Sequence, residues 1–120
     1  MFNSAVELFD RFCEGFVDRN LEKVIGVFRD DAKFLAPVIS EMSGKKTLTD
    51  FFERELPNIE NYRIQKLATW EREDETVIEW KNNYRDKRTG ISHQVGGVTI
   101  VRINNGLVQE MREYCNVPSQ

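Results

Sequence analysis

The sequence predicts an α+β fold in which one strongly curved, mainly antiparallel sheet wraps around three helices from the first half of the chain. Before Tyr62, apolar residues recur every three or four positions, which is typical of amphipathic helices. After Tyr62, apolar and polar residues alternate as in half-buried strands, and the turns between these segments are short enough for antiparallel neighbours. Helices followed by such strands indicate an α+β arrangement, because the apolar helix faces have only the sheet to pack against. A length of 120 residues fits a single domain, residues 1–120.

The first two helices are expected near the N-terminus. The segment SAVELFDRFCEGFV places its apolar residues on one helical face, and Ser4 with Glu7 forms a capping-box pattern at its start. A short second helix is expected in NLEKVIGVF, where Asn20 can cap the N-terminus and Phe28 belongs to the buried stripe. This helix is expected to end near Asp30.

One strand and a third helix follow. The segment AKFLAP is read as a short strand that stops at Pro37. The third helix is expected in TLTDFFEREL, where Thr47 and Asp50 form a second capping-box pattern and Pro57 ends the helix.

Four longer strands are expected in the second half of the chain. Asn105-Gly106 is a strong signal for a type I′ hairpin between the last two strands. Gly96 and Gly97 interrupt the third of these strands and predict a bulge or bend. The four segments are YRIQKLATWE, TVIEWKNNYR, SHQVGGVTIVRI and LVQEMREYC.

The composition argues against several classes of partner. A net charge of -3 with scattered basic residues argues against nucleic acid. No apolar run approaches the roughly 20 residues that cross a bilayer, so no membrane partner is expected. The segment MFNSAVELFDRF has acids where a signal peptide needs a cationic start and an apolar core, so we expect a cytoplasmic protein.

The cysteine and histidine content argues against a metal site. Cys13 and Cys115 lie far apart in a chain without an export signal and are expected to be reduced, with a disulfide between them as the alternative. One histidine and no paired Cys/His spacing leave a structural metal site without ligands. We expect neither a metal nor a cofactor.

Three segments resemble the nuclear transport factor 2-like proteins, which include ketosteroid isomerases, SnoaL-like polyketide cyclases and limonene epoxide hydrolases. They are RFCEGFVDRNLEKVIGVFRDDAKFLAPV, SGKKTLTDFF and VRINNGLVQEMREYCN. The resemblance covers nearly the whole chain, and the order and spacing of the segments carry it. It implies a cone, with the bent sheet around the helices and a pocket at the wide end.

The resemblance does not extend to the catalytic groups of ketosteroid isomerase. That enzyme uses an Asp general base and an oxyanion hole made of a Tyr and a protonated Asp. The base position, directly before the strand-ending proline, is Ala36 in this sequence. The tyrosine falls on Phe12 and the second aspartate on Thr99. We therefore do not expect isomerisation of steroids by that machinery.

The resemblance also indicates which strand residues face the pocket, because inward positions alternate along each strand. The pocket predicted in this way has an apolar base and a few polar groups, as expected for a small, largely hydrophobic ligand. Phe12 and Trp80 could instead be simple core, and His93 an exposed residue at a strand end. Asn82 and Tyr84 could lie at the rim, and Asn116 is read as a hydrogen-bonding remnant of a family acid. The predicted lining residues are Phe12, Phe34, Ala36, Trp80, Asn82, Tyr84, His93, Thr99 and Met111, with Ile78, Val95, Gly97, Val101 and Cys115 also inward.

Glu113 is the candidate catalytic residue. A carboxylate on the inward face of a central strand is costly to bury without a partner, so it is present either for chemistry or as half of an ion pair. Arg102 or Arg63 would be the partner in the second case. A register slip of one residue would place Tyr114 and Arg112 inside instead.

The opposite face of the sheet carries several apolar residues and no helix to cover it. Such a face indicates a partner surface, and the family resemblance likewise implies a homodimer packed sheet against sheet. The residues expected on this face are Val77, Val98, Ile100, Val108 and Tyr114.

Two functions of different class are consistent with these observations. One is a protein that binds a small apolar ligand without the isomerase groups. The other is a cofactor-independent isomerase, cyclase or hydrolase that uses Glu113 as acid or base, with Tyr84, Asn82 or His93 orienting the substrate.

Overall fold

The structure is a computed structural model, and it describes residues 4–37 and 39–116 of the predicted domain. These residues form three α-helices, one short 3-10 helix and six strands. In chain order they are α1 (Ala5–Asp18), α2 (Leu21–Ile25), β1 (Phe28–Ala36), β2 (Ile39–Ser43), α3 (Lys45–Glu55), η1 (Leu56–Asn58), β3 (Ile59–Glu71), β4 (Thr76–Asp86), β5 (Ile91–Asn104) and β6 (Leu107–Cys115).

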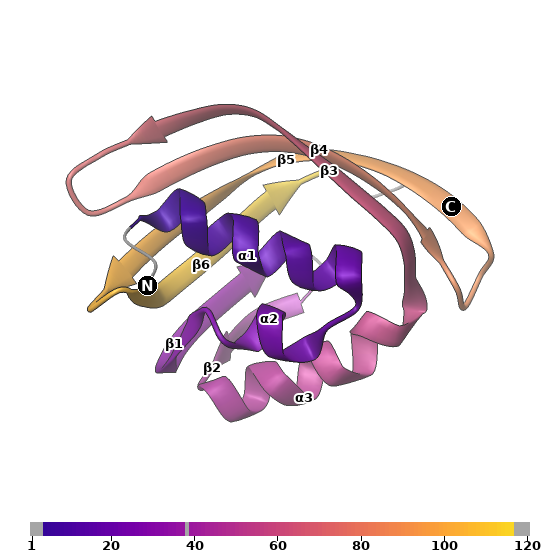
Figure 1. The fold of residues 1–120 in the computed structure, drawn as a ribbon, viewed down its shortest axis with the longest axis horizontal. Helices are drawn as coiled ribbons and strands as arrows, with labels where there is room; N and C mark the ends of the chain where they lie inside the picture. The colour runs from indigo at the N-terminus through magenta and orange to yellow at the C-terminus, as the bar shows by residue number, and fades with distance from the viewer. Residues whose placement is uncertain (1–3, 38, 117–120) are drawn as a thin grey trace.

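The strands form one sheet in the order β2-β1-β6-β5-β4-β3. Only the pairing of β1 with β6 is parallel among the described strands, and the others are antiparallel. In Figure 1 the long strands β3, β4 and β5 arch over α1, and α3 lies opposite the arch, beside β1 and β2. The predicted α+β fold with a curved, mainly antiparallel sheet around three helices is confirmed.

The first helix begins and packs as the sequence predicts. The Ser4 hydroxyl accepts a hydrogen bond from the Glu7 backbone N–H at 3.2 Å, which satisfies one of the free donors at the helix start. Leu8, Phe9 and Phe12 are buried against the sheet. α1 therefore supplies the inner side of the core.

The second helix is shorter than predicted. Asn20 caps it as expected, accepting from the Lys23 backbone N–H at 3.2 Å. The helix ends at Ile25, however, and Phe28 begins β1, so the predicted helix end near Asp30 is wrong. The cause is tertiary, because β6 pairs with this segment and the Val108 backbone N–H donates to the Val27 carbonyl at 2.8 Å.

The start of α3 also differs from the prediction. The helix begins at Lys45, and the residue before it, Gly44, makes no side-chain cap, so the capping box at Thr47 is wrong. Gly44 has φ of +92°, which favours glycine, and its N–H donates to the Ala32 carbonyl at 2.8 Å. The strand β2, which has no predicted counterpart, leads into this turn.

The four later strands match the predicted segments, and the turn between β5 and β6 is of the predicted type. Asn105 and Gly106 have φ of 53° and 79°, as a type I′ turn requires. The predicted bulge at Gly96 and Gly97 is wrong, because β5 pairs with β4 without a register shift through both residues. Gly97 instead allows β6 to approach closely, since a Cβ there would lie 2.5 Å from the Tyr114 carbonyl oxygen.

A bulge between Arg102 and Ile103 changes the parity of β6 near its start. Val108 is consequently fully buried in the core, and its predicted place on the outer sheet face is wrong. Tyr114, beyond the bulge, is 45% exposed, and Val77, Val98 and Ile100 are partly buried.

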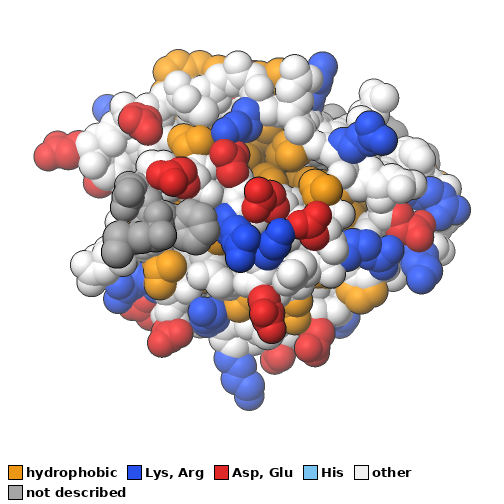
Figure 2. All heavy atoms as spheres, in the orientation of Figure 1, with side chains coloured by type: hydrophobic (Ala, Val, Ile, Leu, Met, Phe, Trp, Pro, Cys, Tyr) orange, Lys and Arg blue, Asp and Glu red, His pale blue; other side chains and the backbone are white. Residues whose placement is uncertain are grey.

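The surface in Figure 2 carries acidic and basic side chains intermixed over the visible face.

Cys13 and Cys115 are both free thiols, as predicted. Within the described ranges, no helix is long and apolar enough to cross a membrane.

Candidate ligand-binding site

The inner face of the sheet, α1 and α3 enclose a cavity of about 250 Å³. Most of its wall is hydrophobic or aromatic, and the polar groups come mainly from β3, β4 and β6. Its lining residues are Phe9, Phe12, Cys13, Phe16, Phe34, Ala36, Pro37, Phe51, Phe52, Glu55, Ile59, Tyr62, Ile64, Trp80, Asn82, Tyr84, Val95, Glu113 and Cys115. Such a wall is typical of sites for small, largely apolar ligands.

The structure brings most of the predicted pocket residues together on this wall. The apolar ones come from α1, β1 and β4, and the polar ones come from β4 and β6. The predicted residues that line the cavity are Phe12, Phe34, Ala36, Trp80, Asn82, Tyr84 and Glu113.

Three predicted pocket residues do not line the cavity. Thr99 and Met111 are fully buried behind the wall, in the packed base of the cone. His93 lies farther along β5, where its ring centroid is 5.3 Å from that of Tyr84. Other side chains separate Thr99 and Met111 from the cavity. His93 is separated from it by its distance along β5.

Two elements that were not predicted to line the cavity, α3 and β3, contribute to its wall. Phe51, Phe52 and Glu55 of α3 and Tyr62 and Ile64 of β3 line the cavity. The alternation of Tyr62 and Ile64 with charged or polar neighbours was the available signal for β3. For α3, the rotation of the helix against the sheet decides which residues face the cavity, and no sequence pattern gives that rotation.

Glu113 lies on the cavity wall beside Thr99, its cross-strand neighbour on β5. Burial raises the pKa of Glu113 from 4.5 to about 7, and a hydrogen bond from the Thr99 hydroxyl opposes this rise. The Trp80 indole N–H donates to the Thr99 hydroxyl oxygen at 2.8 Å. Because Thr99 accepts from the indole, its own proton is free to point at the carboxyl group.

The alternative partners considered for Glu113 are engaged elsewhere or absent from the site. Arg102 pairs with Glu110 at 3.5 Å, and Arg63 is exposed on β3. Arg112, which a register slip would have turned inward, pairs with Glu75 at 2.9 Å. Among the described residues, no Lys, Arg or His forms a salt bridge with Glu113. Glu113 is therefore an acid without a basic partner.

A second polar group of the wall is centred on Tyr62. The Asn82 side-chain amide N–H donates to the Tyr62 hydroxyl at 3.5 Å, and Tyr62 is hydrogen-bonded in turn to the Cys13 thiol. Burial and the nearby Glu113 raise the pKa of Cys13, and burial raises the pKa of Tyr62 well above 10. Both groups are thus neutral near pH 7. The Asn82 carbonyl oxygen is buried and has no hydrogen-bond partner among the described residues.

The site gives no indication of a metal centre. Over residues 4–37 and 39–116, no group of three or more His, Cys, Asp or Glu side chains is arranged to hold a metal ion.

Comparison with known proteins supports this architecture. The family model of the SnoaL-like domain matches residues 9–111. No curated protein matches the chain.

Several solved structures share the fold. The Mycobacterium tuberculosis protein RV0760c, in complex with estradiol-17beta-hemisuccinate, has a TM-score of 0.80 and 19% identity over 94% of each chain. A hypothetical protein with a ketosteroid isomerase-like fold from Catenulispora acidiphila, in complex with trimethylamine, has a TM-score of 0.79 and 16% identity over 92% of this chain and 86% of that one. An M. tuberculosis epoxide hydrolase of the LEH-like kind has a TM-score of 0.79 and 12% identity over 93% of this chain and 82% of that one. At these identities the likeness concerns the fold.

Proposed function

The chain belongs to the SnoaL-like domain family, and we propose that it binds a small, largely apolar ligand in the cavity between α1, α3 and the sheet. The observation that carries the proposal is the wall itself, which is lined by aromatic rings and carries the Asn82 carbonyl oxygen, a buried acceptor without a partner among the described residues. Burying polar atoms without partners costs free energy, which a ligand with a matching polar group would recover. Two structural neighbours are in complex with small organic molecules, trimethylamine and estradiol-17beta-hemisuccinate.

The size of the cavity limits the ligand. An engineered cavity of about 150 Å³ lined by Leu, Ile and Phe binds benzene. A cavity of about 250 Å³ therefore accommodates a molecule of roughly ten non-hydrogen atoms, such as two fused rings. A larger ligand would have to extend through the opening of the cavity.

The proposed function does not use the catalytic groups of ketosteroid isomerase. The positions that correspond to its base and its tyrosine are Ala36 and Phe12, which add apolar surface to the wall. Thr99, at the third position, lies behind the wall and orients its hydroxyl toward Glu113. A methyl group and a phenyl ring cannot transfer a proton, so steroid isomerisation by that route is not part of the function proposed.

Proton transfer by Glu113 is the second candidate function. A carboxyl group with a pKa of about 7 is matched to general acid-base work at neutral pH, and Glu113 faces the cavity where a substrate would lie. In this case the protein would be a cofactor-independent isomerase, cyclase or hydrolase. Turnover that disappears in Glu113→Gln would support this candidate.

Ligand binding is testable with tryptophan fluorescence. Trp80 lines the cavity, whereas Trp70 is 52% exposed on β3, so each can be replaced by Phe as the control for the other. The neutral two-ring probe 2-indanol should change the emission saturably in the wild type and in Trp70→Phe. Most of this change should be lost in Trp80→Phe. A response that survives unchanged in Trp80→Phe would place the binding site elsewhere.

We further propose that the protein is a cytoplasmic homodimer, with the outer sheet face as the contact surface. Val77, Val98, Ile100 and Tyr114 remain candidates for this surface, whereas Val108 does not because it is in the core. Light scattering at micromolar concentration should give twice the mass of 14.1 kDa. A mass of one chain would contradict the homodimer.

A further inference from the structure

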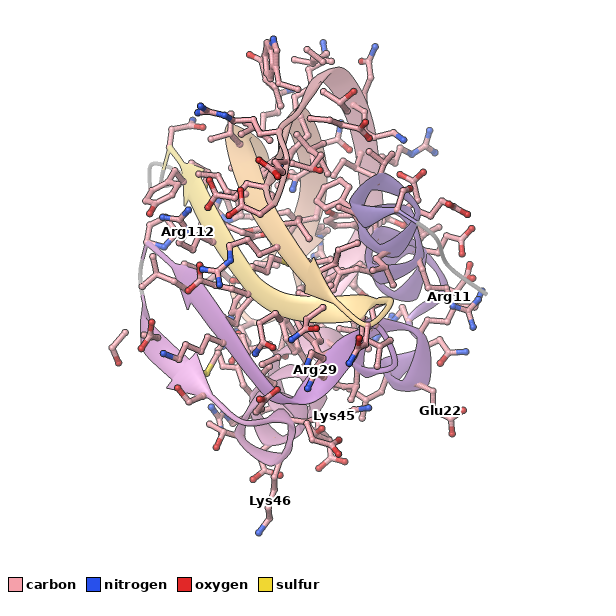
Figure 3. The ribbon with its side chains drawn as sticks, turned by 90° about the vertical axis from the view of Figure 1, so that its left-hand side faces the viewer. Arg11, Glu22, Arg29, Lys45, Lys46 and Arg112 are labelled. Carbon is pink, nitrogen blue, oxygen red and sulfur yellow. The ribbon has the colours of Figure 1, made fainter. Side chains whose placement is uncertain are left out.

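The ionisable side chains of the cavity wall include acids but no Lys, Arg or His of the described residues. The carboxyl groups among them are those of Glu55 and Glu113. Glu55 is neutralised by Arg88 at 3.3 Å, which leaves Glu113 as a carboxyl group with no cation beside it. Figure 3 shows other basic side chains, including Arg29 and Arg112, on the outside of the molecule.

The cavity wall is also rich in aromatic rings. Six Phe, two Tyr and one Trp line the cavity among the described residues. The face of an aromatic ring carries partial negative charge and attracts ammonium groups within about 6 Å of its centroid. The tightly packed ring pairs include Phe12 with Phe52, at a centroid distance of 5.7 Å.

The unpaired polar atom of the wall also carries a partial negative charge. The Asn82 carbonyl oxygen is a buried hydrogen-bond acceptor without a donor among the described residues. The acid and this oxygen both favour a ligand that brings positive charge or N–H donors, and an aromatic wall is compatible with an ammonium group.

From this wall we propose that the ligand is an apolar amine, bound as its ammonium ion against Glu113 with its hydrocarbon part among the Phe rings. The inference rests on the proposed function, because it names the class of ligand for the same cavity. An anionic ligand would be repelled by the carboxylate. A neutral ligand would leave the buried carboxylate without a counter-ion, whereas an ammonium ion supplies one.

The groups that face Glu113 allow this site to be followed by pH. They are Cys13 of α1, Tyr62 of β3 and Cys115 of β6, together with the hydroxyl of Thr99 on β5. Burial raises the pKa of Cys13, Tyr62 and Cys115, so these three stay neutral between pH 5.5 and 7.5. Glu113 is the group among them that changes charge in this interval.

The test uses calorimetric titration with three indane derivatives that share the same two-ring skeleton and differ in charge. They are 2-aminoindane, which is cationic, 2-indanol, which is neutral, and indane-2-carboxylate, which is anionic. At pH 7.5 the wild type should bind 2-aminoindane at least tenfold more tightly than 2-indanol and should not bind the carboxylate measurably. Glu113→Gln should lose the preference for the amine and keep the affinity for 2-indanol. Glu79→Gln, which removes a carboxylate from β4, two strands away in the sheet, should keep the preference.

The pH profile of the wild type is a second measurement that needs no variant. Only the ionised form of Glu113 supplies the counter-ion, so the affinity for 2-aminoindane should rise with pH. With a pKa of about 7, the ionised fraction rises roughly twentyfold between pH 5.5 and 7.5, and the affinity should follow it. The affinity for 2-indanol should not rise over the same interval.

The outcomes separate this inference from the function on which it rests. Saturable binding of 2-indanol with no preference for the amine would overturn the amine and leave the apolar site intact. Equal binding of indane-2-carboxylate, or an amine affinity independent of pH, would also overturn it. If none of the three compounds binds, both the ligand class and the apolar ligand site are refuted.

Discussion

Replacing Glu113 with glutamine is expected to stabilise the protein above pH 7 and to change its stability little at pH 4.5. Glutamine has nearly the same shape as a protonated glutamic acid and keeps an oxygen that can accept from Thr99. What the substitution removes is the cost of holding a carboxylate in a largely apolar wall.

The sign and size of the effect follow from the pKa of Glu113. Because folding raises this pKa from 4.5 to about 7, the folded protein holds the proton over an interval in which the unfolded chain has released it. The free energy of unfolding of the wild type should therefore fall as pH rises from about 4.5 to about 7, and then level off. At about 1.4 kcal/mol per pH unit, the loss approaches roughly 3 kcal/mol.

Urea denaturation of the two proteins at pH 4.5, 6 and 8 measures this quantity. The difference in the free energy of unfolding, Glu113→Gln minus wild type, should increase from pH 4.5 to pH 8 by roughly 3 kcal/mol. Ionisable groups other than Glu113 are present in both proteins, so their contributions cancel in this difference in the free energy of unfolding. A difference that does not change with pH, or a variant that is clearly less stable at pH 8, would show that the carboxylate is a paired structural ion.

Three further substitutions test the structure around the site. Thr99→Val should raise the pKa of Glu113 further, because the hydroxyl that lowers it is lost, and should destabilise the protein by about 1–3 kcal/mol since a buried indole N–H loses its acceptor; NMR titration that shows no rise would refute the contact. Gly97→Ala should destabilise the protein by about 1–3 kcal/mol in urea, because its Cβ would lie 2.5 Å from a backbone oxygen, whereas Gly96→Ala has 3.8 Å of room and should cost much less. Equal costs for the two would contradict the close approach of β6. Asn20→Ala should lower the thermal stability by an amount equivalent to about 1 kcal/mol, because α2 loses its cap, and an unchanged midpoint would rule this cap out as a stabilising contact.

The sequence predicted those elements whose pattern is local and long. The strands β3 to β6 each carry an alternating pattern with a turn signal at their ends, and Asn105-Gly106 specified its hairpin. The helix α1 has both a cap and a continuous apolar face. These features need no knowledge of the rest of the chain.

The elements that the sequence did not predict depend on contacts with distant segments. Phe28 continues the apolar spacing of α2, but it is in β1 because β6 pairs with that segment. The strand β2 spans Ile39–Ser43, too short for a clear alternation, and exists as a partner of β1. Val108 turned inward because of a bulge at Arg102 and Ile103, which no residue type signals.

The same distinction applies to the cavity. Alternation along β4 and β6 placed Trp80, Asn82 and Glu113 on one side of the sheet, and these residues do line the cavity. Whether an inward residue reaches the cavity is decided by what packs in front of it, and so Thr99 and Met111 lie behind the wall. The contribution of α3 depends on the packing of a helix against a sheet and was not accessible from the sequence.

The side chains of the wall determine what the cavity can select. Ala36 and Phe12 contribute apolar surface and have no group that transfers a proton. Thr99 adds no charge and directs its hydroxyl toward Glu113. The charge of the inner wall then depends on a carboxyl group that no side chain of the described residues neutralises. Such a cavity is suited to recognising a ligand by the charge that the ligand itself brings, and titration with matched cationic, neutral and anionic probes measures that selectivity directly.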